Sequence, residues 1–225
     1  MLTPRYLFRD DYAQFSDYFQ AHPHKDVSFR KGEYLWAPGT PAQRHFYIKK
    51  GIAQVYVDHE DGHRKILSYH GQGTVFPGCQ KASFKIENSI VMKAITDVEA
   101  MSFDHDTYYV MFQSCEALNA QILEWFACYI NLLIYEAAHQ KYNDSFMQLC
   151  NLLYLMYVHS APELERTIAI TQEELAGILG ANRVTVAKNV SKLCQLGVIA
   201  THRNWIKLLD LEQLAQFCSK ETQED

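Results

Sequence analysis

The residues best suited to contact another molecule lie between Thr171 and Gly197, in the run TQEELAGILGANRVTVAKNVSKLCQLG. Arg183, Lys188 and Lys192 are basic, and within this run no acidic residue follows the central GANR turn. Arginine can bond the two acceptors of guanine with parallel N–H groups, and lysine neutralises phosphate as a point charge. The pattern therefore predicts contacts to nucleic acid.

Two short helices must position these side chains. The first is predicted to begin at a capping box, Thr171 with Glu174 three residues on, and to end at Gly180. The second is predicted to begin at Asn182 and to end at Gly197. Apolar residues repeat at helical spacing in both: Leu175, Ile178 and Leu179, then Val186, Val190 and Leu193. Two short helices joined by a glycine turn are typical of a helix-turn-helix, whose second helix enters the major groove.

A β-hairpin is predicted directly after the second helix. Residues 198–200 and 205–209 are mainly apolar and flank the polar turn His202-Arg203-Asn204. Such a hairpin is the wing of a winged helix. The alternative is an ordinary helix pair that only packs into a core, but the caps, the glycine turn, the one-sided charge and the hairpin together favour the winged helix.

Length, composition and charge limit which other classes of protein this chain can belong to. The 225 residues suffice for one or two domains, and a net charge of −5 means that positive charge must gather on one face to bind nucleic acid. The N-terminus lacks the apolar segment of a signal peptide, and stretches such as 152–158 are too short to cross a bilayer. The six cysteines form no CxxC pair, so we expect free thiols and a cytoplasmic protein.

The front part of the chain has the pattern of a β-protein. From residue 29 to about 103, short apolar runs alternate with turn signals such as Pro38-Gly39 and Asp61-Gly62. Ile52 to Val57 alternates as a half-buried strand. Many short strands at regular spacing predict a barrel or a double-sheet roll.

From Glu116 to Tyr142 the apolar period becomes helical. One stripe holds Leu118, Ile122, Trp125, Tyr129 and Leu132, and a second holds Leu123, Phe126, Ile130, Leu133 and Ala137. Two stripes imply burial on two sides, and the spacing also suits a two-stranded coiled coil. We assign the first stripe to a dimer interface and the second to the roll. The alternative is a single buried core helix in a monomer.

Taken together, these stretches resemble the CRP/FNR family of transcription regulators. The run TQEELAGILGANRVTVAKNVSKLCQLGVI is similar to the family's DNA-binding module, and RKGEYLWAPGTPAQRHFYIKKGIAQVY with GHRKILSYHGQGTVFPG to its cyclic-nucleotide-binding-type β-roll. The resemblance implies an α+β fold: a double-sheet β-roll in residues 1–115, a long dimerisation helix in 116–142 and a winged helix-turn-helix in 143–225. It also implies a homodimer on pseudo-palindromic double-stranded DNA, with RNA polymerase as a candidate partner, and no enzyme.

Many family members read DNA with Arg-Glu-Thr-Val followed by a basic residue. The matching run here is Arg183-Val184-Thr185-Val186, with Lys188. The resemblance implies that Arg183 contacts guanine, whereas Val184 replaces a glutamate and suits a thymine methyl group; the alternative for Val184 is a contact to the wing. The predicted DNA-binding residues are Thr171, Gln172, Asn182, Arg183, Val184, Thr185, Lys188, Lys192 and Arg203.

The effector site departs from the family pattern. A cyclic-nucleotide site of this family needs a Gly-Glu pair for the ribose and an Arg-Ser pair for the phosphate, and the matching pairs here are Gly78-Cys79 and Asn88-Ser89. Without the guanidinium the cyclic phosphate loses its bidentate partner, so we expect a small effector other than cyclic AMP. The candidate pocket residues are Tyr69, Phe76, Gly78, Cys79, Phe84, Asn88, Ser89, Tyr129 and Leu133. The alternative is that these side chains simply fill the roll.

Two further classes stay open. A haem- or redox-sensing regulator of the same architecture would use His45, His70 or Cys79 as an axial ligand, and the absence of any cysteine before Cys79 argues against an N-terminal iron–sulfur cluster. A cupin-like metalloenzyme would need a His-x-His pair with a glutamate and a distant histidine, and His59 and His63 do not form such a pair. We therefore predict no resident cofactor or metal.

Overall fold

The computed structural model describes residues 2–40, 43–78, 84–159 and 166–223. The chain divides into two compact units, one of Leu7–Tyr129 and one of Met1–Tyr6 with Ile130–Asp225. The second boundary falls inside a single helix, α3 (Glu116–Tyr142). The sequence analysis predicts three domains, with boundaries at 115/116 and 142/143. This division stays a prediction.

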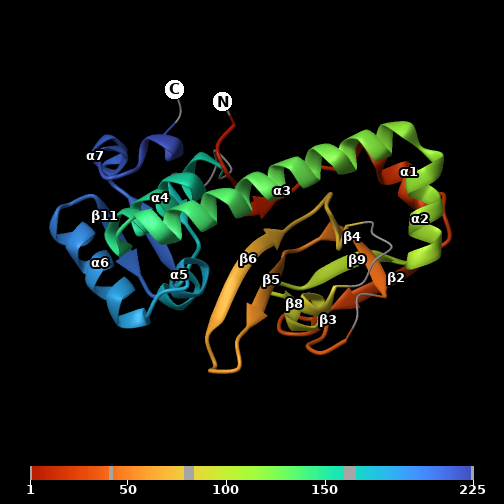
Figure 1. Ribbon diagram of the computed structural model, residues 1–225, viewed down its shortest axis with the longest axis horizontal. Coiled ribbons are helices and arrows are strands. Elements are labelled where there is room, and N and C mark those ends of the chain that lie inside the picture. The colour runs from red at the N-terminus through yellow and green to blue at the C-terminus, as the bar shows by residue number, and fades with distance from the viewer. Residues whose placement is uncertain (1, 41–42, 79–83, 160–165, 224–225) are drawn as a thin grey trace. The chain divides into compact units, whose positions relative to one another are not determined.

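The first unit is built on two β-sheets, which confirms the predicted double-sheet roll (Figure 1). A five-stranded sheet has the order β1 (Leu7–Phe8), β6 (Arg64–His70), β5 (Ala53–Asp58), β8 (Ile90–Ala94) and β3 (Tyr34–Trp36). A four-stranded sheet has the order β2 (Lys25–Phe29), β9 (Val98–Asp104), β4 (Arg44–Lys50) and β7 (Val75–Phe76). Neighbouring strands are antiparallel except β1 and β6, which are parallel.

The core of the roll is made by side chains of the long central strands. Val55 of β5, Ile48 of β4 and Phe103 of β9 are completely buried. The turn between β4 and β5 requires Gly51, because its φ is +88° and a Cβ there would lie 2.1 Å from the carbonyl oxygen of Asp97. The tight turn lets the two strands join different sheets of the roll.

Short helices complete this unit. They are η1 (Ala13–Phe15), α1 (Ser16–Gln20), η2 (Lys85–Ser89) and α2 (His105–Ser114). Asp104 caps α2 by accepting a hydrogen bond from the backbone N–H of Thr107 at 2.8 Å. Phe19 of α1 is fully buried and lies 4.7 Å from the ring of Tyr47, so α1 closes one end of the core.

The long helix is confirmed, but its two apolar stripes are used the opposite way from the prediction. Leu118, Ile122 and Trp125, which the sequence analysis assigned to a dimer interface, are at most 2% exposed within one chain. The Trp125 ring lies 5.5 Å from Phe8 of β1 and stacks on Tyr129 at 5.2 Å. A side chain covered by its own chain cannot reach a partner, so this assignment was wrong.

The stripe that was assigned to the roll is the exposed one. Leu123, Ile130 and Leu133 are 64%, 52% and 41% exposed. The second member of this stripe, Phe126, is half-buried, whereas Leu132 of the first stripe is fully buried. Periodicity shows that a helix has two apolar stripes. Which stripe is buried depends on the side chains of strands far away in the sequence, such as Phe8 of β1.

By length and composition alone, α3 is also apolar enough to cross a membrane. An 18-residue window within Glu116–His139 has a mean hydropathy of 1.3. The expectation that every apolar stretch is too short for a bilayer was therefore wrong by this criterion. The helix has one stripe covered by protein and one exposed apolar stripe, a pattern that a protein partner can also explain.

The second unit contains the helix-turn-helix and its wing. Around the three-stranded antiparallel sheet β10-β12-β11 lie the helices of this unit (Figure 1). The elements are α4 (Ser145–Val158), β10 (Thr167–Ile168), α5 (Gln172–Leu179), α6 (Arg183–Gln195), β11 (Ile199–His202), β12 (Trp205–Leu208), α7 (Leu211–Gln216) and η4 (Lys220–Thr222). Both predicted helices and the hairpin are present, and β10 adds an outer strand to the wing sheet.

Candidate nucleic-acid interface and effector site

Local capping bonds fix the start of α5 and the turn between α5 and α6. The Thr171 hydroxyl accepts from the backbone N–H of Glu174 at 3.1 Å, and the Glu174 carboxylate accepts from the backbone N–H of Thr171 at 2.8 Å. Gly180 ends α5 with φ +60°, and the side chain of Asn182 accepts from the N–H of Val184 at 2.8 Å. These bonds hold the N-terminal end of α6 at the surface.

The outward face of α6 carries the residues that the sequence assigned to base reading. Val186, Val190 and Leu193 are buried, so the opposite side of the helix faces solvent. Arg183 and Lys188 are exposed there. Val184 is 61% exposed, which argues against the alternative that it packs on the wing. An apolar side chain on this face is free to contact a thymine methyl group.

Other predicted contact residues have structural partners. The Thr171 hydroxyl also donates to the Glu174 carboxylate at 2.8 Å, so it belongs to the helix cap. Lys192 lies nine residues after Arg183, about 13 Å along the helix axis, and its ammonium sits 3.9 Å from the ring centroid of Phe146 on α4. We expect Lys192 to stabilise the packing of α6 on α4 and not to contact DNA.

The remaining predicted contacts differ in exposure. Asn182 is exposed but serves as the cap of α6, and Gln172 and Thr185 are half-buried. Arg203 is exposed in the two-residue turn of the wing, between the paired residues His202 and Trp205. Of the nine residues, Arg183, Val184 and Lys188 are exposed within the first two turns of α6, while Arg203 lies on the wing.

Sequence reasoning missed one charged residue at this surface. Glu173, in the first turn of α5, forms an ion pair with Arg183, with 3.5 Å between carboxylate oxygen and guanidinium nitrogen. The two side chains are 79% and 70% exposed. The sequence offers no signal for this pair, because an acid in the first turn of a helix is common for reasons of the helix dipole alone.

The residues predicted to form the effector pocket differ widely in burial, as far as the structure describes them. Tyr69 and Phe76 are buried, but Phe84 is 57% and Leu133 41% exposed, and Asn88 is also exposed. The assignment of Phe84 and Leu133 to the pocket stays a prediction, and within one chain both side chains lie at the surface. Gly78, Ser89 and Tyr129 are partly buried, and Cys79 lies outside the described residues.

Aromatic side chains fill the space where this pocket was expected. His70 stacks on Phe8 with ring centroids 5.6 Å apart and lies 4.6 Å from Phe76. A Cβ added to Gly78 would lie 2.4 Å from the ring of Phe126 on α3. The contacts favour the alternative that these residues fill the roll.

The two histidines considered as haem ligands are engaged in the fold. Nδ1 of His45 donates to the carbonyl oxygen of Pro77 at 3.0 Å, so its Nε2 accepts from Nδ1 of His105 at 3.1 Å. Burial lowers the pKa of His45 to about 4, which keeps the ring neutral at neutral pH. Nε2 of His70 lies 3.0 Å from the Ser68 hydroxyl.

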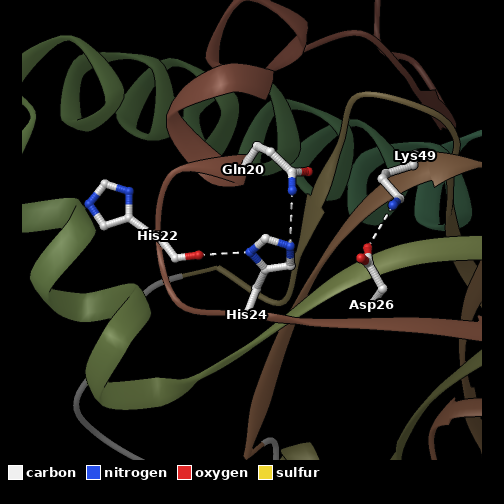
Figure 2. A network of polar contacts seen from close by, with 5 residues as sticks. All are labelled: Gln20, His22, His24, Asp26 and Lys49. Atoms are coloured by element: carbon white, nitrogen blue, oxygen red, sulfur yellow. Dashed lines mark hydrogen bonds and ion pairs between the residues drawn. The ribbon is translucent and has the colours of Figure 1, made fainter.

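One His-x-His pair, which the sequence analysis passed over, lies just before β2. Figure 2 shows the rings of His22 and His24 pointing in different directions. Nδ1 of His22 contacts the carbonyl of Tyr18 at 2.8 Å, and Nδ1 of His24 contacts that of His22 at 2.7 Å. Among the described residues no group of three or more histidine, cysteine or carboxylate ligands comes together, so these contacts form a polar network near the start of the sheet.

Two family models match the chain. One describes a Crp-like helix-turn-helix domain and matches residues 148–217, and the other describes a cyclic nucleotide-binding domain and matches residues 26–115. The chain belongs to the CRP/FNR family of transcription regulators. Its two matched regions are the wing-bearing unit and the roll described above.

Curated relatives of this CRP/FNR protein span nearly its whole length. It is 25% identical over 201 residues to the CRP-like cAMP-activated global transcriptional regulator of Mycobacterium tuberculosis, covering 84% of this chain and 86% of that protein. It is also 25% identical over 206 residues to the transcriptional regulator SdrP of Thermus thermophilus, covering 88% and 96%. These relatives are transcription regulators.

Solved structures show the same fold. FixK2 from Bradyrhizobium japonicum matches with a TM-score of 0.74 at 18% identity, covering 88% of this chain and 98% of that one. A CooA mutant from Carboxydothermus hydrogenoformans matches with a TM-score of 0.75 at 18% identity, covering 90% of each chain. At this identity the likeness concerns the fold alone.

The different surroundings of the two lysines on α6 give a test. Lys188→Ala is expected to reduce the slope of log binding constant against log salt by about one unit, because one phosphate contact is lost. Lys192→Ala is expected to leave that slope unchanged and to lower thermal stability slightly, since it removes the contact to Phe146. Fluorescence anisotropy at several salt concentrations measures the slopes. Equal losses of slope would place both lysines on the DNA.

Proposed function

We propose that this protein is a homodimeric, sequence-specific regulator that binds pseudo-palindromic double-stranded DNA with two copies of α6, and that it is not an enzyme. The observation that carries the proposal is the exposed start of α6, where Arg183 and Val184 in the first turn and Lys188 in the second turn face solvent. Arg203 on the wing is placed to reach a phosphate. We expect the protein to act in the cytoplasm, where it binds DNA. Membership of the family also suggests RNA polymerase as a partner.

The exposed stripe of α3 supports dimerisation. Its members Leu123, Ile130 and Ala137, together with the exposed neighbours Ala127 and Ile134, follow one another at steps of four, three, four and three residues. This is the spacing with which two parallel helices pack knobs into holes. Leu123 and Ile134 are each 64% exposed in one chain, and a second copy of the helix would remove this apolar surface from water. We infer that this stripe is the dimer interface, in place of the one first assigned.

Symmetric dimers read symmetric sites. Two copies of α6 related by a twofold axis would enter successive major grooves on one side of the duplex, with half-sites about one helical turn apart. Arg183 supplies two parallel donors for guanine, and Val184 supplies an apolar contact for a thymine methyl group. Each half-site is therefore expected to hold a guanine next to a preferred A·T pair.

The effector is a small molecule other than cyclic AMP. Asn88, which stands where the family has the phosphate-binding arginine, is a neutral and exposed residue of η2. Among the described residues nearby, His70 contacts aromatic rings and Phe126 approaches Gly78 closely, which supports a packed roll.

Recognition of DNA can be tested by selection from random duplexes. The wild-type protein is expected to enrich a symmetric motif. Arg183→Ala should relax the choice at one base pair of each half-site and cost about 1–3 kcal/mol of binding free energy. Val184→Glu should shift the preferred A·T pair toward one that contains cytosine, because a carboxylate accepts from its amino group. A selection that returns no symmetric motif would contradict the proposed function.

Two aspartate substitutions on α3 distinguish the two stripes. Ile130→Asp should break the dimer and weaken DNA binding while each chain stays folded, because Ile130 is 52% exposed in one chain. Ile122→Asp should lower the stability of the roll by about 3 kcal/mol or more, because it buries an unpaired charge. Sedimentation and thermal unfolding separate these effects. An Ile130→Asp protein that remains dimeric would remove this stripe as the interface.

Calorimetric titration of the wild-type protein with cyclic AMP tests the effector assignment. No saturable heat is expected, because no guanidinium is available to form the two charge-assisted bonds that the cyclic phosphate needs at this position. The experiment should be run in parallel with DNA binding in the presence and absence of the nucleotide. Saturable binding that also changes DNA affinity would show that the site uses a different set of residues.

A further inference from the structure

A cluster of polar side chains joins the end of α3 to α4. Nδ1 of His139, in the last turn of α3, contacts the side-chain nitrogens of Asn143 and of Asn151, the latter at 3.1 Å. The side-chain nitrogen of Gln148 donates to the backbone carbonyls of His139 and Asn143 at 3.0 Å each. We call these four residues the α3–α4 joint, because they connect the last turn of α3 to the first two turns of α4.

The direction of the bond between Asn151 and His139 is fixed by a third residue. Oδ1 of Asn151 accepts from the backbone N–H of Ser219 at 2.9 Å, and a backbone nitrogen can only donate. The other end of this amide is therefore its NH2 group, which lies 3.1 Å from Nδ1 of His139 and 3.3 Å from the Ser219 hydroxyl. Asn151 is 1% exposed, so it depends on these partners for its hydrogen bonds. Nδ1 of His139 must accept, which places the ring proton on Nε2.

We propose that the α3–α4 joint is a pH-sensitive switch, in which a second proton on the ring of His139 opens the joint and lowers the affinity for DNA. A protonated imidazole carries an N–H at both nitrogens, so Nδ1 would face amide donors from which it can no longer accept. Asn151 cannot turn its oxygen toward the ring without giving up the N–H of Ser219. The proposal rests on the proposed function, because DNA binding is the output that the switch changes.

The charges around His139 set the direction of its response. Burial lowers the pKa of His139 from its ordinary value of 6.5, and the carboxylates of Glu221 on η4 and Glu136 on α3 oppose this shift. Because the closed joint disfavours the proton, its contribution to stability is complete above pH 6.5 and falls as the pH drops below that value. Acid therefore favours the open joint.

The other titratable groups around the ring stay neutral. Tyr135 of α3 lies against His139 with ring centroids 3.7 Å apart, and burial raises the pKa of its phenol. Tyr6 of the N-terminal segment lines the same small cavity of about 20 Å³, and burial raises the pKa of its phenol well above 10. From α4 the cavity receives the uncharged amides of Gln148 and Asn151. The proton on His139 is thus the change in charge that acid brings to this cavity among the described residues.

The joint is connected to α6 through the start of α4. The side-chain nitrogen of Asn189 on α6 donates to the Ser145 hydroxyl at 3.1 Å, and the ammonium of Lys192 lies over the ring of Phe146. Ser145 and Phe146 are the first two residues of α4 and directly follow the turn that the joint holds. Opening the joint would therefore move the side chains against which α6 packs.

A single proton can shift this equilibrium by a bounded amount. If the open joint has the ordinary pKa and the closed joint binds no proton, one pH unit below that pKa favours the open form about ten-fold. With about one molecule in ten open at neutral pH, the affinity for DNA would then fall about two-fold. About ten-fold is the largest fall that one proton can cause at that pH, and it requires DNA to bind only the closed joint.

The test measures the affinity of the full-length dimer for its selected duplex by fluorescence anisotropy from about pH 7.5 to about pH 5.5. His139→Asn keeps an acceptor near the position of Nδ1 but cannot be protonated. The ratio of wild-type affinity to that of His139→Asn is expected to fall about two- to ten-fold over this range, and taking the ratio cancels the effect of the other histidines. His59→Asn, which removes an exposed histidine of the roll, is the matched control, and its ratio to wild type should stay constant.

A second variant changes the sign of the response. In Asn151→Asp a carboxylate can accept from the N–H of Ser219 and also from a protonated Nδ1, so acid should close the joint and the fall in affinity should be lost or reversed. NMR of the histidine ring nitrogens in the wild type should show that His139 is neutral at pH 7.5, with its proton on Nε2. Thermal unfolding at each pH checks that the variants keep their fold.

Three results would overturn the switch. They are a wild-type His139 with its proton on Nδ1, a ratio of wild type to His139→Asn that does not change with pH, and an Asn151→Asp protein that keeps the wild-type response. A wild-type protein that has no sequence preference at pH 7.5 would instead overturn the proposed function. A selective wild type with any of the three results overturns this proposal alone.

Discussion

The packing of one face of α3 against the aromatic core of the roll is the interaction on which the rest of the molecule depends. Trp125 contacts Phe8 and Tyr129, while Leu118 and Ile122 on the same face are almost completely buried. Once this stripe is covered, the other apolar stripe must face outward along the same helix. The packing inside one chain therefore decides which apolar stripe is left for a partner to cover.

The same aromatic packing continues into the strands of the roll. His70, Phe8 and Phe76 form a continuous aromatic cluster, and Phe126 approaches Gly78 closely. Aromatic groups stabilise the contact between roll and helix without a ligand, because they bury large apolar surfaces. The chain thus keeps the family's fold with an aromatic contact between roll and helix. An effector that changes the position of α3 would have to change this contact between the side chains of the strands and those of the helix.

Local placement of charge lets an acidic protein present a DNA-reading surface. The chain has a net charge of −5, yet Arg183 and Lys188 lie together on the exposed side of α6. The caps at Thr171 and Asn182 satisfy the backbone at the starts of α5 and α6, so the side chains of the first turn of α6 remain available. Lys192, by contrast, is directed to Phe146 and contributes to packing. The two lysines of α6 therefore have different roles: Lys188 is available for DNA, and Lys192 contributes to packing.

The sequence by itself determined the features that depend on local interactions. The capping box of Thr171, the left-handed Gly180, the Asn182 cap and the two strands of the wing were predicted, because each needs only residues a few positions apart. The double-sheet roll and the long helix could be predicted from periodicity and turn residues in the same way. Tertiary structure alone decided which stripe of α3 is buried, that Phe84 and Leu133 lie at the surface, and that Glu173 meets Arg183. These outcomes depend on contacts between segments far apart in the chain or across a turn, whose geometry no spacing of residues encodes.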